Sequence, residues 1–258
     1  GTITGPTAPL CPGVTTRLDL TGQSAGATLQ WQFSANNTSW TDIAGETNPF
    51  YTTSSIMTST TFFRVKATCG STTATSPSFQ VQVGPIPVIS TFPHTIDFSN
   101  TVAPTLPCGW SVENPSNNET WIIKNQGTSA APDNAAYYDH KGGTPDDWLF
   151  TPMLALQAGK SYQVSFKYKT NSTTGVLEVR HGAGANAAAM PAVNSIYKNS
   201  ALTNRNYGTV TTGIISPATT GNFALGFYYT HTSYGTFVYI DDIEIIELPS
   251  CAGTPTAG

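Results

Sequence analysis

Apolar and polar residues alternate along two stretches of the chain, residues 60–69 and 161–170. In the second stretch, the apolar positions are Tyr162, Val164, Phe166 and Tyr168. Successive side chains of a β-strand point to opposite faces, so this period of two predicts strands with one buried and one solvent-exposed face. Other strand candidates, bounded by turn residues, are residues 17–20, 29–33, 121–123, 176–180, 208–215, 222–229 and 235–246.

The candidate strands follow one another at short intervals, which is typical of an all-β sandwich fold. Residues 186–190 have a helical pattern, and Pro191 ends it after about one turn. Residues 83–87 read Val-Gly-Pro-Ile-Pro, and two prolines with a glycine cannot continue a sheet ladder, so we predict a linker there. The predicted domains are residues 1–84 and 85–258, each the size of one β-sandwich.

The composition is poor in charge and rich in turn residues. Of the 258 residues, 23 are Gly, 18 are Pro and 10% are charged, against about 25% charged residues in an ordinary globular protein. The formal net charge of −4 leaves no basic excess for nucleic acid, and no apolar run approaches the roughly 18 residues of a membrane span. The chain starts abruptly at Gly1, which indicates either that a signal peptide has been removed or that this is a piece of something longer. Its two ends are similar in sequence, so we expect a piece of a longer multidomain chain.

Four cysteines, Cys11, Cys69, Cys108 and Cys251, are spread widely along the chain. They form no C-x-x-C pair of the kind used by zinc sites and redox centres. An even number at wide spacing favours two disulfides and an oxidising compartment, so we expect a secreted or cell-surface protein. Of the three possible pairings, we favour Cys11 with Cys69 and Cys108 with Cys251, because each bridge then stays within one predicted domain.

Residues 8–83 contain a set of segments that carries a family resemblance. The segments are Leu29-Gln30-Trp31-Gln32-Phe33-Ser34, the turn Asn36-Asn37, Trp40-Thr41-Asp42-Ile43 and residues 61–69. Together they resemble the short immunoglobulin-like repeats of large secreted bacterial adhesins. The resemblance implies an immunoglobulin-like β-sandwich with Trp31 in its core. It departs from an antibody domain at Cys11, which lies before the first long strand candidate, and at Ala67, which replaces the tyrosine-corner residue.

A second set of segments extends over residues 96–247. It comprises Asp97-Phe98-Ser99-Asn100, Cys108-Gly109-Trp110, Asp147-Trp148-Leu149-Phe150-Thr151-Pro152, residues 159–166 and residues 239–245. In order and spacing these segments resemble the cleaved-adhesin domain family, the jelly-roll modules in the haemagglutinin/adhesin regions of gingipain-type proteases. The resemblance implies a jelly-roll β-sandwich that binds a target and is not itself catalytic.

The same resemblance implies a calcium ion between the start of the first strand and the end of the last, with an acid from each. Asp241 is the acid of the last strand. Ser99 stands where the first-strand acid is expected, and Asp97 and Asn100 offer oxygens beside it. Calcium requires six to eight such oxygens. The alternative is that Asp241 only holds a loop by hydrogen bonds.

Several motifs that suggest catalysis or cofactors lack their structural context. Residues 22–26 fit G-x-S-x-G, but a strand candidate follows instead of a helix. Residues 182–187 fit G-x-G-x-x-A, but no acid follows about twenty residues later. Polysaccharide cleavage needs two facing carboxylates, and the spacing of the available acids pairs none of them. Those acids are Glu113, Glu119, Asp146, Asp147 and Glu178.

Residues 227–234 read Phe-Tyr-Tyr-Thr-His-Thr-Ser-Tyr, which gathers aromatic rings and hydroxyls at the end of one strand candidate. Strand alternation buries either Phe227 with Tyr229 or else Tyr228. We predict that Tyr234, His231 and Tyr228 contact a ligand, with Tyr234 and His231 facing solvent in the turn.

We expect non-catalytic adhesion to a glycan or an extracellular protein. The alternatives are a targeting appendage of a secreted hydrolase and a jelly roll that itself acts on polysaccharide.

Overall fold

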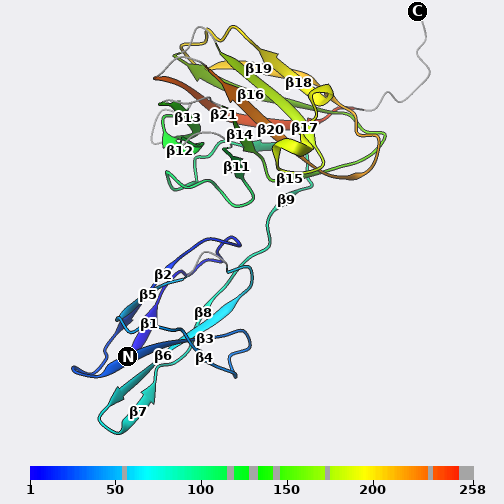
Figure 1. Ribbon diagram of the computed structural model, residues 1–258. Coiled ribbons are helices and arrows are strands. Elements are labelled where there is room, and N and C mark those ends of the chain that lie inside the picture. The colour runs from blue at the N-terminus through cyan, green and yellow to red at the C-terminus, as the bar shows by residue number, and fades with distance from the viewer. Residues whose placement is uncertain are drawn as a thin grey trace, which may run out of the picture. The chain divides into compact units, whose positions relative to one another are not determined.

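The computed structural model describes residues 1–53, 57–114, 119–127, 133–141, 146–171, 175–231 and 235–249. The chain forms two compact units, Gly1–Ile86 and Pro87–Gly258, so the boundary lies two residues beyond the one predicted from sequence. Both units consist of β-sheets, and the helical segments of the described residues are two 3-10 turns in the second unit (Figure 1). None of the helices in these ranges is long and apolar enough to span a membrane.

The first unit is an immunoglobulin-like β-sandwich of two antiparallel sheets. One sheet has the order β1 (Thr2–Thr4), β2 (Arg17–Thr21), β5 (Phe50–Thr52). The other has the order β4 (Thr41–Asp42), β3 (Thr28–Ser34), β6 (Thr61–Cys69), β7 (Thr72–Thr75), with β8 (Phe79–Val81) also paired to β6. Trp31 is fully buried in the core, as the resemblance implies, and its indole nitrogen donates to the Asn48 carbonyl at 2.9 Å.

The second unit is a jelly-roll β-sandwich. Its six-stranded sheet has the order β12 (Ile122–Asn125), β13 (Asn134–His140), β21 (Thr236–Glu247), β16 (Tyr162–Thr170), β19 (Gly208–Ile215), and β10 (His94–Ile96) also pairs with β21. Its seven-stranded sheet has the order β11 (Ser111–Glu113), β14 (Asp147–Phe150), β20 (Gly221–Thr230), β15 (Met153–Leu156), β9 (Val88–Ile89). The strands β17 (Val176–Gly182) and β18 (Ser195–Asn199) extend this sheet beyond β20.

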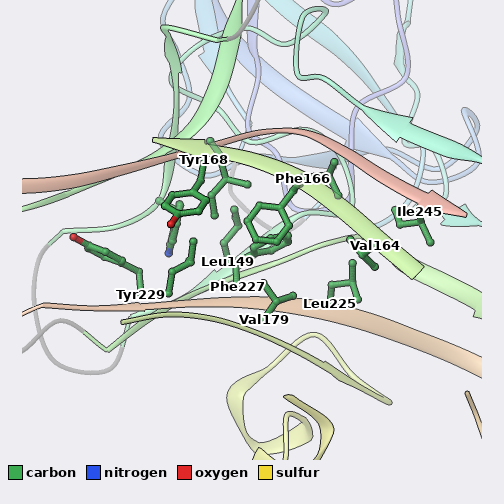
Figure 2. Close-up of a cluster of buried hydrophobic side chains, with 14 of the residues drawn as sticks. Leu149, Val164, Phe166, Tyr168, Val179, Leu225, Phe227, Tyr229 and Ile245 are labelled. Carbon is green, nitrogen blue, oxygen red and sulfur yellow. The ribbon is translucent and has the colours of Figure 1, made fainter. Parts of the chain in front are cut away.

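Alternate side chains of the two sheets meet in one hydrophobic core (Figure 2). The apolar positions predicted for residues 161–170 are all buried, and β16 presents them to the opposite sheet. Phe166 meets Phe227 of β20 edge to face, with ring centroids 5.4 Å apart. Phe227 and Tyr229 point into this core, so Tyr228 points to the outer face of the seven-stranded sheet.

The predicted helical segment at 186–190 forms the 3-10 turn η1 (Ala187–Ala189), and η2 (Ala192–Asn194) follows it. The Asn186 side chain caps η1 by accepting a hydrogen bond from the Ala189 amide at 2.9 Å. In Figure 1 these two turns lie beside β17. The backbone amide of Ala187 also donates to the Glu113 carboxylate at 2.7 Å, which fixes the segment to β11.

The predicted bridge between Cys11 and Cys69 is wrong, because Cys69 is a free, exposed cysteine. Leu10 pairs with Val83, two residues after Val81, and Val81 pairs with Thr61 at the start of β6. Cys11 therefore lies near the start of β6, whereas Cys69 is the last residue of β6. Eight residues of strand separate Thr61 from Cys69, or roughly 26 Å, while a disulfide needs Cα atoms within about 7 Å. Cys11 and Cys108 are both disulfide-bonded. Cys251, the predicted partner of Cys108, lies outside the described residues.

Candidate functional site

The three residues predicted to contact a ligand have different positions. His231 is 3% exposed, so the prediction that it faces solvent is wrong. The strand alternation of β20 continues one residue past its end, which turns His231 inward beside Tyr229, with the two rings stacked at 6.4 Å. Tyr228 lies on the outer face and is partly exposed. Tyr234 lies outside the described residues.

Tyr228 belongs to a row of side chains that crosses five strands on the outer face of the seven-stranded sheet. Pairing registers place Glu113 opposite Trp148, Trp148 opposite Tyr228, Tyr228 opposite Glu178, and Glu178 opposite Lys198. Directly paired residues of antiparallel strands project to the same face of a sheet. We call these five residues the Trp148 row.

Aromatic rings form the centre of the Trp148 row. The ring centroids of Trp148 and Tyr228 are 4.8 Å apart, and Trp148 also stacks on Phe150 at 5.7 Å with an interplanar angle of 4°. Gly226 lies beneath these rings, and a Cβ there would come within 3.0 Å of both Trp148 and Phe150. The missing side chain therefore lets the two rings lie close against the sheet.

Charged side chains lie beside the aromatic rings. Glu178 is 3% exposed and forms ion pairs with Arg180 at 2.9 Å and with Lys198 at 3.6 Å. Burial on its own would raise the pKa of Glu178, but hydrogen bonds from Arg180 and Ser195 and the two positive charges lower it overall. Glu178 is therefore ionised at neutral pH. The Arg180 guanidinium also lies 5.3 Å from the centroid of the Trp148 ring.

The segment that contains η1 and η2 covers part of this face. Met190 is 2% exposed and belongs to one cluster with Trp148 and Phe150, and its carbonyl accepts a hydrogen bond from Arg180 at 3.1 Å. Trp148 is consequently 6% exposed, whereas Tyr228 stays partly accessible to solvent. A ligand approaching this face would meet Tyr228 first, with Lys198 beside it.

Two acids considered for polysaccharide cleavage belong to the row, and they do not face each other. Glu113 and Glu178 are three strand spacings apart, or about 14 Å. The paired carboxyl groups of glycosidases are separated by at most about 9.5 Å. The row therefore presents these two acids as separate polar contacts.

The residues predicted to hold calcium lie around the junction of β10 and β21. Ile96 pairs with Ile243, so Asp97 follows the end of β10 close to Asp241 and Asp242. A β-bulge occurs at these two acids, where the register with β16 shifts and Asp242 has a φ of 46°. Asp241 is fully buried, whereas Asp97 and Asn100 are exposed. Within the described ranges, no three residues of the types His, Cys, Asp and Glu form a potential metal cluster.

The structure adds one carboxylate that the sequence analysis missed. Asp133, 6% exposed, directly precedes β13, which pairs with β21 beside the bulge. Burial raises the pKa of Tyr207, and the negative charges of Asp241 and Asp133 raise it further, so both acids lie near this hydroxyl. Carboxylate oxygens are hard donors of the kind that calcium prefers, so these two buried acids fit the donor chemistry of this ion.

Comparisons with known proteins find family models and solved structures. Residues 1–85 match a domain of unknown function (DUF8696), and residues 144–249 match the delta endotoxin family model; neither match covers half of the chain. No curated protein matches the chain.

Among solved structures, the chain is similar in fold to cleaved adhesin domains of Lys-gingipain from Porphyromonas gingivalis. The K1 domain is 17% identical with a TM-score of 0.46, covering 60% of this chain and 98% of that domain. The K2 domain is 14% identical with a TM-score of 0.47, covering 60% and 97%. The xylan-binding CBM22-1 domain of Paenibacillus barcinonensis Xyn10C is 12% identical with a TM-score of 0.41, covering 61% and 95%.

Proposed function

We propose that this chain is a non-catalytic binding region of a secreted or cell-surface protein, and that the Trp148 row binds a glycan. The observation that supports this most directly is the contact between the rings of Trp148 and Tyr228, 4.8 Å apart and tilted by 35°, with charged side chains on both sides along one sheet face. Binding sites commonly combine aromatic surface with a few fixed polar groups in this way.

Each part of the row has a use in sugar recognition. The flat face of an aromatic ring packs against the C–H face of a pyranose, and this contact needs no charge on the sugar. The buried Glu178 carboxylate holds Arg180 and Lys198 in place by ion pairs, and the exposed Lys198 ammonium donates hydrogen bonds to sugar hydroxyls. Thr230 hydrogen-bonds Tyr228 and adds another hydroxyl beside the ring.

Replacing Tyr228 by alanine is expected to weaken binding of the glycan identified on an array by tenfold or more, or about 1.4 kcal/mol. Isothermal titration calorimetry with that glycan measures the loss. Lys198→Ala, at a side chain that is 56% exposed, should weaken binding without altering the fold. Phe50→Ala is the matched aromatic control because Phe50 is 39% exposed and lies in the first unit.

Four outcomes would contradict this proposal. Normal affinity in both Tyr228→Ala and Lys198→Ala would mean that the row does not contact the glycan. Loss of binding in Tyr234→Ala alone would place the contact outside the described residues. Release of reducing sugar from polysaccharide would favour the catalytic alternative, and binding to an extracellular matrix protein without any glycan would favour the protein-adhesion alternative.

We also propose that Ca²⁺ binds beside Asp241, held by the Asp241 and Asp133 carboxylates with further oxygens from Asp97 and Asn100. The ion would join the segment after β10, the start of β13 and the bulge of β21, which are distant in sequence. Because calcium would bind the folded unit alone, a free concentration of 100 times its Kd adds about 2.7 kcal/mol to the stability of that unit.

Chelation is therefore expected to lower the unfolding transition of the second unit and leave that of the first unit in place. Scanning calorimetry with and without EDTA measures this difference. Asp241→Asn and Asp133→Asn should each remove the response, while Asp19→Asn, in the first unit, should retain it. A calcium titration of the wild-type chain that shows no heat, together with no effect of EDTA, would mean that Asp241 has only a structural role.

A further inference from the structure

A second row of side chains crosses the outer face of the six-stranded sheet, on the opposite side of the sandwich from the Trp148 row. Registers place Ile122 opposite Tyr137, Tyr137 opposite Tyr239, and Tyr239 opposite Lys169. Tyr207, which directly precedes β19, lies next to Lys169. Together with Phe237 and Lys124, which contact these rings, the aromatic and lysine residues form what we call the tyrosine face: Lys124, Tyr137, Lys169, Tyr207, Phe237 and Tyr239.

The aromatic rings of this face form one cluster, in which Tyr137 and Tyr239 are buried and Tyr207 and Phe237 are partly exposed. The centroids of Tyr137 and Tyr239 are 4.5 Å apart, and Phe237 lies 5.4 Å from Tyr239 and 6.2 Å from Tyr137. The core of the unit does not need these rings, because they lie on the side of the sheet that faces away from it. Aromatic residues on an outer sheet face are suited to packing against a ligand.

Lysine ammonium groups lie over the rings. The Lys124 Nζ is 4.1 Å from the centroid of Tyr137, and the Lys169 Nζ lies between two rings, 4.6 Å from the centroid of Tyr207 and 4.7 Å from that of Tyr239. Burial lowers the pKa of Lys169, which agrees with an ammonium group partly removed from water.

These two lysines differ from the others in their charge partners. The chain has seven lysines, and Lys66, Lys141, Lys160, Lys167 and Lys198 each form an ion pair with a carboxylate. Within the described ranges, Lys124 and Lys169 have no such pair. Both of these lysines are therefore on the one sheet face that also carries four aromatic rings.

The acids nearest to the tyrosine face have other partners. Asp139 forms an ion pair with Lys141 at 3.7 Å and hydrogen-bonds Tyr137, whose pKa is raised first by burial and then by this acid. Asp242 forms an ion pair with Lys167 at 2.9 Å. Asp241 and Asp133 also lie near the Tyr207 hydroxyl, and both are buried. The ammonium groups of Lys124 and Lys169 are therefore the charges of this face that an anion from outside the chain can contact.

We propose that the tyrosine face binds an acidic polysaccharide, one whose sugars carry carboxylate or sulfate groups. A pyranose ring would pack on the partly exposed rings of Phe237 and Tyr207, and Lys124 and Lys169 would contact the acid groups on either side. β12 and β16 are three strand spacings apart, or about 14 Å, so a chain with acid groups on several sugars contacts both lysines. This inference does not depend on the Trp148 row, which lies on the other sheet.

The test measures binding of polygalacturonate, chondroitin sulfate and neutral dextran to the full chain by calorimetry at two salt concentrations. We expect binding of at least one acidic polysaccharide, no binding of dextran, and weaker binding at higher salt because the contact is electrostatic. The carboxylated and sulfated polymers distinguish the two sources of negative charge.

Lys124→Gln with Lys169→Gln is expected to weaken this binding by tenfold or more. Lys66→Gln with Lys160→Gln makes the same change in net charge away from the face and should leave the affinity unchanged. Equal losses of affinity in both double variants would show that binding depends only on net charge, and this would overturn the proposal. It would also be overturned if the wild-type chain binds no acidic polysaccharide, or if polyglutamate binds as well as the polysaccharides do. Tyr228→Ala should keep this binding even if the Trp148 row proves inactive, so the two proposals fail separately.

Discussion

Replacing Phe166 by alanine is expected to lower the free energy of unfolding of the second unit by about 3–5 kcal/mol. Phe166 is fully buried at the middle of β16, between the two sheets (Figure 2). Its ring meets Phe227 at 5.4 Å and Tyr197 at 5.5 Å, both nearly perpendicular. Alanine would leave a cavity between β16 and the opposite sheet, which holds both of these rings, so the cavity cannot close without moving a sheet.

Denaturant unfolding measures this loss, with the transition of the first unit as an internal reference. Phe50→Ala is the control, because this ring is 39% exposed and lies 4.2 Å from the Arg17 guanidinium. Its replacement should cost about 0.5–1 kcal/mol and affect the first unit alone. A loss below about 1 kcal/mol for Phe166→Ala would show that the sheets do not pack tightly at this ring.

The alternation of apolar residues predicted the strands whose outer face is exposed to solvent. In β16, Tyr162, Val164, Phe166 and Tyr168 all point into the core, and the residues between them are partly exposed. The period of two is visible there because one face meets the core and the other meets water. The candidate strand at 208–215 has the same bounds in the structure as β19.

The sequence analysis missed β13 and β14 because both of their faces are covered. All four residues of β14 are buried, with Leu149 in the core and Trp148 and Phe150 under the outer cluster that contains Met190. In β13, Tyr138 faces the core while Tyr137 faces outward into the aromatic surface. Apolar residues on both faces remove the alternation, so the pattern fails in the two strands that carry the central rings of the proposed binding faces.

Only part of the candidate site could be predicted. The sequence shows which side chains of one strand share a face, but it does not show which residues of neighbouring strands pair. Alternation alone separates Tyr228 from Phe227 and Tyr229, and the structure places Tyr228 on the outer face. The partners Trp148 and Glu178 come from strands distant in sequence, and only the pairing of those strands brings them beside Tyr228. His231 was placed in a solvent-exposed turn because the sequence does not show that the alternation continues past the end of the strand.

Replacing Gly182 by alanine is expected to destabilise the second unit by about 3 kcal/mol and to expose Trp148. A Cβ at Gly182 would overlap the backbone oxygen of Ala189, and it would also lie 3.2 Å from the Met190 sulfur. A backbone atom cannot rotate away as a flexible side chain can, so the segment with η1 must move off the sheet. Met190, which is 2% exposed against Trp148 and Phe150, would then lose its contacts with both rings.

Denaturant unfolding and acrylamide quenching of tryptophan fluorescence measure the two effects of Gly182→Ala. Gly221→Ala is the matched control, because Gly221 is also a strand glycine and a Cβ there meets nothing closer than a ring carbon of Phe223 at 3.8 Å. Alanine at that position should be neutral or stabilise by up to about 1 kcal/mol, since it restricts the unfolded chain. If Gly182→Ala has the same free energy of unfolding as the control and leaves the acrylamide quenching unchanged, the segment with η1 does not pack against the sheet in solution. If it destabilises and the accessible Trp148 binds the glycan more tightly, the segment limits access to the Trp148 row, and shortening it should raise affinity further.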